Sequence, residues 1–435
     1  MSQLLEVRDL SPIRGLSEDE DAWLSRLQGH LRTSDHVIRL GEAQGDEDFV
    51  VSRDPHGNWQ AGRYIGELAF SGRRLRISPR LGEDTITAWL AGALNLIALP
   101  DTAARRTSEA FLASLMGVVW SRAVDAASRH GPPAIRREHR HEGFYVRGRL
   151  DVRRSARLRR AGSAHVASTT RPRDLDNDVS RALVAAERVL SQHIGHTRWR
   201  TPRVRQVLPR LVEAVGARPQ PPDDGSLARI RYTPITRPFK EVARLSARIA
   251  RQQGFSATGE KGKAEGLLLD VAELWELFLL HCTRRAFRAL RVEHGTAAGA
   301  DTFLLHAAAN SHKRMGRLKP DILVRDGDQV VGVFDAKYKR LLDHWPERPA
   351  GVDRGDLYQL ASYLARHDPQ GDAVGCLLYP RDPDQNAQAT AETEGPWRAA
   401  SGSTVVFGRV ATGEAEAISQ LQRLLTTTHQ EALAR

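Results

Sequence analysis

The sequence predicts a mixed α/β protein, α+β overall, built from three successive regions. Short alternating segments separated by Gly, Asp-Pro and Ser-Gly turns fill the first eighty residues, which favours strands. Helical periodicity prevails in the middle of the chain, and the last third alternates strands with helices. We therefore expect a β-rich domain over residues 1–82, a helical and basic region over 83–238, and an α/β domain with a mixed sheet over 239–435.

Composition places the chain among soluble globular proteins. Of its 435 residues, 41% are hydrophobic and 27% are charged, with both signs interspersed, which excludes wholesale disorder. No apolar run is long enough and free enough of charge to span a membrane, and no secretory signal opens the sequence. The only cysteines are Cys282 and Cys376, which excludes a disulfide framework and a four-cysteine zinc site. We expect a cytoplasmic protein.

The N-terminal elements follow from local signals. Ser17 and Glu20 form a capping-box pattern at the start of a short helix that carries Trp23, Leu24 and Leu27. Runs of apolar and β-branched residues then predict strands at 36–41, 49–53, 64–71 and 75–79.

Helical patterns dominate the next part of the chain. Apolar residues at helical spacing predict helices over 83–97, 108–129, 179–193, 203–215 and 239–252, and one long apolar helix over 264–291. The segment GFYVRGRLDVRR (143–154) alternates in the manner of a strand pair.

Basic charge is concentrated in one segment. The formal net charge is +11, and 57 of the 64 basic residues are arginines. Twelve arginines face only three acidic residues between Arg136 and Arg173, an excess typical of nucleic-acid binding. A solvated basic surface, or a patch facing an acidic partner, is the alternative. The residues expected to bind DNA are Arg136, Arg137, Arg147, Arg149, Arg153 and Arg154.

The most informative stretch runs from Leu318 to Arg340. It predicts a β-hairpin with strands at 322–325 and 329–337 around the turn Asp326-Gly327-Asp328. Alternation places Val333, Asp335 and Lys337 on one face. The same folding brings Asp321 near Asp335, as direct or diagonal neighbours roughly 5–8 Å apart.

Two converging carboxylates favour a hard divalent cation. They repel each other unless a proton or a metal ion lies between them, and Mg²⁺ prefers such oxygen ligands, with Mn²⁺ as a possible substitute. Asp321 and Asp335 are the expected metal ligands, assisted by the carbonyl of Ala336. Lys337 can position a nucleophilic water or stabilise charge that builds on phosphorus. Pro-Asp, thirteen residues, then Asp-x-Lys resembles the PD-(D/E)xK nuclease superfamily.

Flanking helices add further candidates. Glu276 lies in the apolar segment LLLDVAELWELFLLHC, where an ionised carboxylate is costly unless paired or bound to a metal, and this superfamily commonly places a glutamate there. Asp356, Gln359 and Tyr363 share one helical face, and Gln-x-x-x-Tyr resembles the RecB-like branch of these nucleases. We expect Glu276 to orient water or complete the metal shell, and Gln359 and Tyr363 to steady the site or the DNA backbone.

Taken in order, the motifs resemble the McrC family, the nuclease subunit of the modified-cytosine-dependent restriction system. The segments that carry the resemblance are IGELAFSGRRLRISPRLG (65–82), GRLDVRRS (148–155), WELF (275–278), PDILV (320–324), VFDAKYK (333–339), DLYQLASY (356–363) and LLYP (377–380). The resemblance implies a DNA endonuclease subunit that acts on double-stranded DNA together with a hexameric McrB-like AAA+ GTPase ring. It also implies that the N-terminal part binds that ring and stimulates its hydrolysis of nucleotide.

The chain itself is not expected to bind a nucleotide, since no GxxxxGK[ST] phosphate loop occurs in it. The nearest approach, TGEKGKAEG (258–266), lacks the first glycine in register and the Ser/Thr. Two other classes of function stay open. One is a stand-alone RecB-like exonuclease of DNA repair, and the other is a non-catalytic regulator of an AAA+ ring.

Overall fold

The computed structural model describes most of the chain, and its contacts group the residues into two units. Unit 1 combines residues 1–102 with 258–435, and unit 2 is formed by residues 103–257. The finer division into domains 1–82, 83–238 and 239–435 stays a prediction. The described residues are 3–31, 37–38, 49–93, 108–136, 138–195, 199–251, 264–295, 303–308, 310–339, 352–381 and 393–433.

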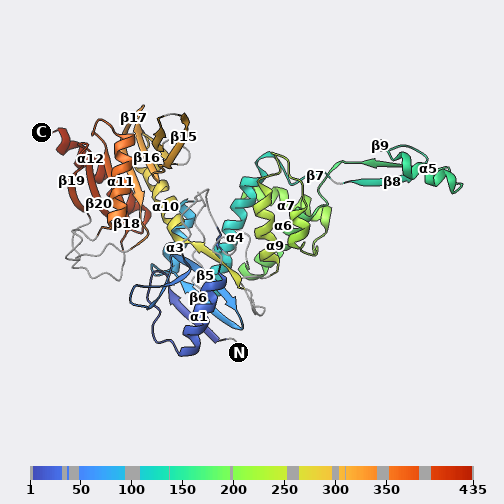
Figure 1. The fold of residues 1–435 in the computed structure, drawn as a ribbon, viewed down its shortest axis with the longest axis horizontal. Helices are drawn as coiled ribbons and strands as arrows, with labels where there is room; N and C mark the ends of the chain where they lie inside the picture. Colours follow the sequence, from blue (N-terminus) through green and yellow to red (C-terminus); the bar gives the residue numbers. More distant parts are fainter. Residues whose placement is uncertain are drawn as a thin grey trace. The chain divides into compact units, whose positions relative to one another are not determined.

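A five-stranded sheet near the N-terminus forms the first layer of unit 1 (Figure 1). Its strand order is β1-β6-β5-β12-β2, with β1 parallel to β6 and with β5 antiparallel to both β6 and β12. The strands are β1 (Gln3–Arg8), β2 (Val37–Ile38), β5 (Tyr64–Phe70), β6 (Arg73–Ser78) and β12 (Glu265–Asp270).

Helix α1 (Glu18–His30) packs on this sheet as its sequence predicts. Ser17 is its N-cap, and the reciprocal capping box with Glu20 is present. Trp23, Leu24 and Leu27 are buried in the same core as strand residues of β5 and β6. A hairpin of β3 (Val51–Arg53) and β4 (Trp59–Ala61) adds to that core, and helix α3 (Glu83–Ala93) follows β6.

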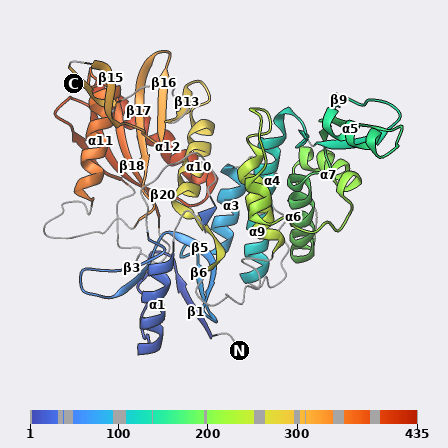
Figure 2. The ribbon, with the colours of Figure 1, turned by 45° about the vertical axis from the view of Figure 1, so that its right-hand side comes forward.

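The C-terminal part of unit 1 holds a six-stranded mixed sheet (Figure 2). Its order is β13-β16-β17-β18-β20-β19, in which β17, β18 and β20 are parallel and the remaining neighbours are antiparallel. The strands are β13 (Arg291–His294), β16 (Ile322–Asp326), β17 (Gln329–Ala336), β18 (Val374–Pro380), β19 (Thr393–Arg398) and β20 (Thr404–Val410). The expected α/β order of the last third is thereby confirmed.

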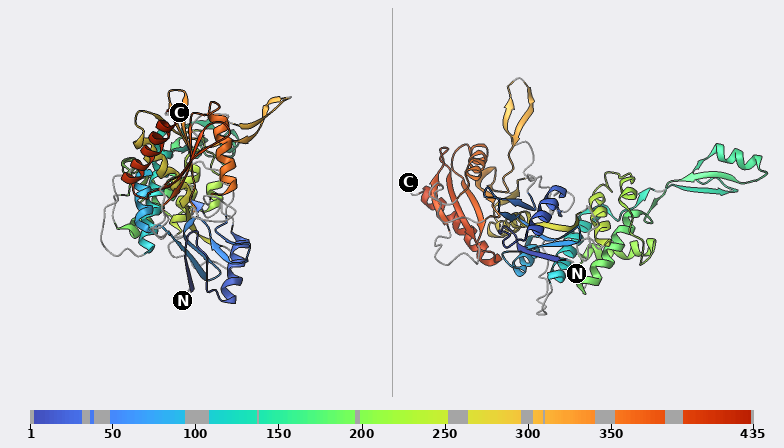
Figure 3. Two further views of the ribbon diagram at one scale, coloured as in Figure 1. Left: turned by 90° about the vertical axis from the view of Figure 1, so that its left-hand side faces the viewer. Right: turned by 60° about the horizontal axis from the view of Figure 1, so that its bottom comes forward.

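Helices cover both faces of this sheet (Figure 3). On one face, α11 (Arg354–His367) buries Leu360 and Leu364 in a core with Val333 and Leu377. On the other face, α10 (Val271–Ala286) and α12 (Glu414–Leu433) pack together. Trp275 of α10 donates from Nε1 to the carbonyl of Leu378 at 3.1 Å, which ties that helix to the sheet.

Unit 2 is a helical bundle that carries an arm. The helices α4, α6, α7 and α9 pack on one another, and small two- and three-stranded sheets with helix α5 form the arm, which extends beyond the helices (Figures 1 and 3). The helices are α4 (Ser108–Ala127), α5 (Val152–Arg160), α6 (Asp178–Ile194), α7 (Pro202–Val215), α8 (Asp224–Ala228) and α9 (Phe239–Ala250), with a 3₁₀ turn at Ser128–His130. Within the described parts of the chain, no helix is long and apolar enough to cross a membrane.

Two element predictions are wrong. The long helix expected over 264–291 is strand β12 followed by α10, because Asp270 caps a new helix by accepting from the N–H groups of Ala272 and Glu273. In the segment 143–154, expected to form a pair of strands, fewer residues belong to strands than predicted. Its last residues begin α5, where Asp151 accepts from the N–H of Arg154.

Candidate active site

The hairpin of β16 and β17 brings two carboxyl groups together. Ile322 lies opposite Phe334 in the ladder, so Asp321, one residue earlier, comes beside Asp335. The N–H of Ala336 donates to Oδ2 of Asp321 at 2.7 Å. The predicted hairpin is confirmed, and its register places both carboxyl groups at the same end of the sheet.

Burial opposes the ionisation of both carboxyl groups, and the charge of Asp335 also opposes that of Asp321. Burial, followed by the negative charges of Asp335 and Glu276, raises the pKa of Asp321 well above its ordinary value. Burial also raises the pKa of Asp335, which is only 2% exposed, although the charge of Lys337 works in the opposite direction. Crowded carboxyl groups of this kind are stabilised by a shared proton or by a bound cation.

Lys337 lies at the centre of the cluster. Its Nζ lies 2.6 Å from Oδ2 of Asp335 and donates to Oε1 of Gln359 at 2.7 Å. Burial lowers the pKa of Lys337, but the charges of Asp335 and Asp356 outweigh that effect and raise it above its ordinary value. The side chain is therefore held as an ammonium ion, with Asp335 and Gln359 as its nearest partners.

Helix α11 supplies the next two predicted residues. It begins after Asp353, which caps it by accepting from the N–H of Gly355 at 2.7 Å. Gln359 donates from Nε2 to the hydroxyl of Tyr363 at 2.8 Å. Burial, followed by the charge of Asp335, raises the pKa of the Tyr363 hydroxyl above its ordinary value. One chain of contacts thus runs from Asp335 through Lys337 and Gln359 to Tyr363.

Glu276 lies near the cluster but has a partner of its own. On α10 it is hydrogen-bonded to Nε2 of His294, the last residue of β13. Its side chain is 16% exposed, and its charge is among the causes of the raised pKa of Asp321. The residue is therefore close enough to act on Asp321 electrostatically.

The donor chemistry of the cluster fits Mg²⁺. Among the described residues, no group of three or more His, Cys, Asp or Glu side chains is arranged to hold a metal ion. Asp321 and Asp335 would therefore need the carbonyl of Ala336 and water to complete a coordination shell. Mg²⁺ is usually bound in that way, through one or two carboxylates, with several waters retained.

The predicted DNA-binding arginines belong to the arm of unit 2. The larger of its two sheets is antiparallel and consists of β8 (His139–Gly143), β10 (Val166–Thr170) and β9 (Arg149–Leu150). The smaller pairs β11 (Arg173–Asp174) with β7 (Ile135–Arg136). Helix α5 has five arginines and no buried residue. Arg136, Arg147, Arg149, Arg153 and Arg154 are all exposed, whereas Arg137 lies outside the described residues.

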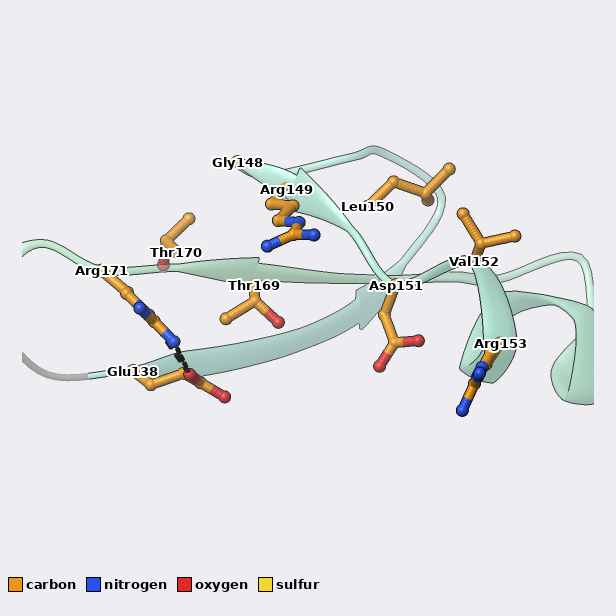
Figure 4. A pocket seen from close by; sticks show the side chains of 10 residues that line it. All are labelled: Glu138, Gly148, Arg149, Leu150, Asp151, Val152, Arg153, Thr169, Thr170 and Arg171. Carbon is orange, nitrogen blue, oxygen red and sulfur yellow. Dashed lines mark hydrogen bonds and ion pairs between the residues drawn. The ribbon is translucent and has the colours of Figure 1, made fainter.

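The arm also carries carboxylates that neutralise part of this charge. Arg154 pairs with Glu142, and Arg171 pairs with Glu138 at 2.7 Å. Figure 4 shows the second pair at one side of a groove of about 780 Å³, with Arg149 and Arg153 on its other walls. The groove is therefore lined by charges of both signs.

Comparison with known proteins assigns the family. The chain matches the model of the McrBC 5-methylcytosine restriction system component over residues 59–380. The chain belongs to this family. The residues matched to the McrBC family model include Asp321, Asp335 and Lys337. They also include the whole arm of unit 2.

Two solved structures resemble this McrBC family member. One is a refined half-complex from a tetradecameric assembly of Thermococcus gammatolerans McrB AAA+ hexamers with bound McrC. It matches with a TM-score of 0.53 and 17% identity, over 98% of this chain and 100% of that chain. The other, a cryo-EM structure of the Thermococcus gammatolerans McrBC complex, matches at a TM-score of 0.34 and 17% identity, over 66% and 88% of the two chains. The search of the curated proteins found no match.

Sequence reasoning missed two sets of contacts around this McrBC site, those of Asp356 with lysines and that of Glu276 with His294. Asp356, noted only as a member of the helix face, lies 3.5 Å from Nζ of Lys337 and 2.5 Å from Nζ of Lys339. Its position three residues before Gln359 was the available signal. The pairing of Glu276 with His294 had no such signal, because it joins α10 to a strand 18 residues later.

A buried cluster next to Lys337 was also missed. Asp9, at the end of β1, is completely buried and accepts from the hydroxyl of Tyr338 at 2.7 Å and from the N–H of Arg80 at 2.5 Å. The guanidinium of Arg80 lies over the Tyr338 ring at 4.8 Å. These contacts join the N-terminal sheet to the residue that follows Lys337.

Proposed function

We propose that the chain is the Mg²⁺-dependent DNA endonuclease subunit of a modification-dependent restriction system. The observation that carries this proposal is the cluster of Asp321, Asp335 and Lys337 at one end of the C-terminal sheet. Two carboxyl groups of raised pKa beside a fixed ammonium ion suit a divalent cation and a phosphodiester. The family, a component of the 5-methylcytosine restriction system, supports DNA with modified cytosine as the substrate class.

Each residue has a defined task in this proposal. Asp321, Asp335 and the carbonyl of Ala336 would hold the metal, and Glu276 would orient a water near Asp321. The bound metal would supply Lewis-acid activation of the phosphate and of a water. Lys337, held by Gln359, donates a hydrogen bond to a phosphate oxygen and so stabilises the negative charge that develops there. Tyr363 orients the amide of Gln359 by accepting its hydrogen bond.

The nucleotide motor belongs to another chain in this account. We infer a hexameric McrB-like AAA+ GTPase as partner, supported by the similar fold found together with McrB AAA+ hexamers and bound McrC. The sequence has no phosphate loop of its own. We assign partner binding to the N-terminal residues 1–82 and place the assembly in the cytoplasm, where Cys282 and Cys376, both free and buried, would stay reduced.

The arm is proposed to hold the DNA backbone. Arg136, Arg147, Arg149 and Arg153 are exposed, and each phosphate contact that is lost lowers the salt dependence of binding by about 0.9 in the log–log slope. Replacing these four arginines by alanine should therefore weaken DNA binding and flatten its salt dependence. An unchanged affinity and slope would show that the arm serves another partner.

Reconstitution tests the proposed function directly. Closed circular DNA with modified cytosine is incubated with the chain, the AAA+ partner, GTP and Mg²⁺. We expect the wild type and Asp326→Asn, an exposed carboxyl in the hairpin turn, to cut the circle, and Asp335→Asn to leave it intact. Digestion only of linear DNA without the partner would support the exonuclease alternative. Stimulated GTP hydrolysis without any cutting would support the non-catalytic regulator.

A further inference from the structure

A second hairpin stands beside the candidate active site, and no other described residue of the chain covers either of its faces. It consists of β14 (Phe303–Ala307) and β15 (Asn310–Arg317), and Figure 3 shows it, in yellow-orange, projecting from the sheet that holds the site. Leu305 lies opposite Met315 in the ladder, and the two side chains are 56% and 68% exposed. Leu304, on the opposite face, is 53% exposed. A two-stranded hairpin that is solvated on both faces is marginally stable by itself.

The charge of this hairpin has one sign. Residues 303–317 contain Lys313, Arg314 and Arg317 and no Asp or Glu. These three cations are exposed. Two copies of such a hairpin would repel each other, whereas a polyanion would complement it. The charge therefore favours nucleic acid over a second copy of this chain.

Strand β15 of the hairpin leads directly into the end of the sheet that holds Asp321 and Asp335. Leu318 follows β15 directly and is buried in the core that includes Val333 and Tyr363. Further upstream, eight residues before Phe303, the N–H of Gly295 donates to the carbonyl of Asp321 at 3.2 Å. Arg317 is four residues from Asp321, so their Cα atoms are at most about 14 Å apart. An element that begins this close to Asp321 is within reach of DNA bound at the candidate active site.

We propose that the β14–β15 hairpin is a DNA-binding ribbon that enters the major groove beside the scissile phosphate. The inference rests on the proposed function and adds an interaction surface to it. A two-stranded ribbon fits the major groove, which is about 12 Å wide. Lys313, Arg314 and Arg317 contact phosphates at the groove edges. Leu305 and Met315 contact the apolar edges of the bases, such as thymine methyl groups.

Protection of guanine N7 from methylation by dimethyl sulfate tests whether the hairpin occupies the major groove. The probe is a 24-base-pair duplex with EDTA present, so that no cutting occurs. The wild type should protect a short run of N7 atoms, which face the major groove, and Leu305→Ser/Met315→Ser should lose that protection. Retained protection in this double variant would overturn the proposal. A change in the oligomeric mass of this variant, measured by sedimentation, without a change in protection would also overturn the proposal. The hairpin would then join two copies of the chain.

Salt dependence tests the cations of the hairpin on the same duplex. The variant Lys313→Ala/Arg314→Ala/Arg317→Ala should bind at least about tenfold more weakly, with a log–log salt slope lower by about 2 to 3. The charge-matched control Arg288→Ala/Arg366→Ala/Arg423→Ala, three exposed arginines of unit 1, should keep the wild-type slope. Equal slopes in the two variants would overturn the proposal. Failure of the wild type to bind any duplex would instead count against the proposed function itself.

Discussion

The charges around Asp335 determine how single substitutions in the site act. Burial and the charges of Asp335 and Glu276 oppose the ionisation of Asp321, and burial opposes that of Asp335. Lys337 offsets part of that cost. Removing a carboxyl group and removing the ammonium group should therefore have opposite effects on the stability of the metal-free chain.

We expect metal-free Asp321→Asn to be more stable than the wild type near neutral pH, by about 1 to 3 kcal/mol. The raised pKa of Asp321 means that the folded chain binds this proton more tightly than the unfolded chain does. The unfolding free energy of the wild type therefore falls as the pH rises from the ordinary carboxyl pKa to the raised pKa of Asp321. The extra stability of Asp321→Asn grows over the same pH range. Urea unfolding in EDTA at about pH 5 and about pH 7.5 measures this difference. A variant that is less stable than the wild type at both values would contradict it.

Lys337→Met should separate catalysis from metal binding. Without the ammonium group, cleavage should fall by about 10² or more, as expected when one donor to a developing charge is lost. Mn²⁺ affinity should be retained or increased, because a competing cation near Asp335 is gone. Cleavage rates and calorimetric affinities measured on the same preparation decide the matter. Loss of cleavage and of Mn²⁺ binding together would show that Lys337 maintains the structure of the whole site.

At the scale of elements, the misjudged segment 264–291 shows what local periodicity does not reveal. The apolar run LLLDVAELW suits a buried strand or a buried helix equally well. Strand β12 forms because β5 is there to pair with it, although β5 lies about 200 residues earlier in the chain. The β16–β17 hairpin was predictable because its turn, its alternation and its partner strand are all local.

Close approach between β5 and β12 requires glycine, which gives a stability prediction. Gly266 has φ of +150°, and a Cβ there would lie 2.1 Å from the carbonyl oxygen of Glu67. Gly266→Ala should therefore cost about 2 to 3 kcal/mol of unfolding free energy. The control Gly29→Ala, where a Cβ in α1 meets nothing within 4 Å, should be neutral or slightly stabilising. Similar melting temperatures for the two variants would show that β12 does not pair in this register.

At the scale of the whole molecule, the N-terminal sheet and the candidate active site are connected through Tyr338. Its hydroxyl donates to Asp9, which directly follows β1, and the residue before Tyr338 is Lys337. No local pattern could have predicted this contact, because the partners are 329 residues apart. The sequence could predict Asp321, Asp335, Lys337 and Gln359 as members of one site, since a single hairpin and the next helix carry them.

Tyr338→Phe measures the strength of this connection. Asp9 stays buried but loses one donor, which should cost about 1 to 3 kcal/mol of unfolding free energy. The control Tyr358→Phe, with a side chain 66% exposed on α11, should stay within about 0.5 kcal/mol of the wild type. Chemical denaturation of both variants is the measurement. Equal stability of both variants would mean that the Asp9 contact contributes little to the molecule.

Calorimetric titration of Mn²⁺ into the purified chain with a short DNA duplex tests the central claim most directly, because it needs no partner. We predict binding in the wild type and in the control Asp326→Asn, and its loss in Asp335→Asn. Binding that Asp335→Asn leaves unchanged, or no binding by the wild type, would contradict a metal-dependent nuclease site in this chain.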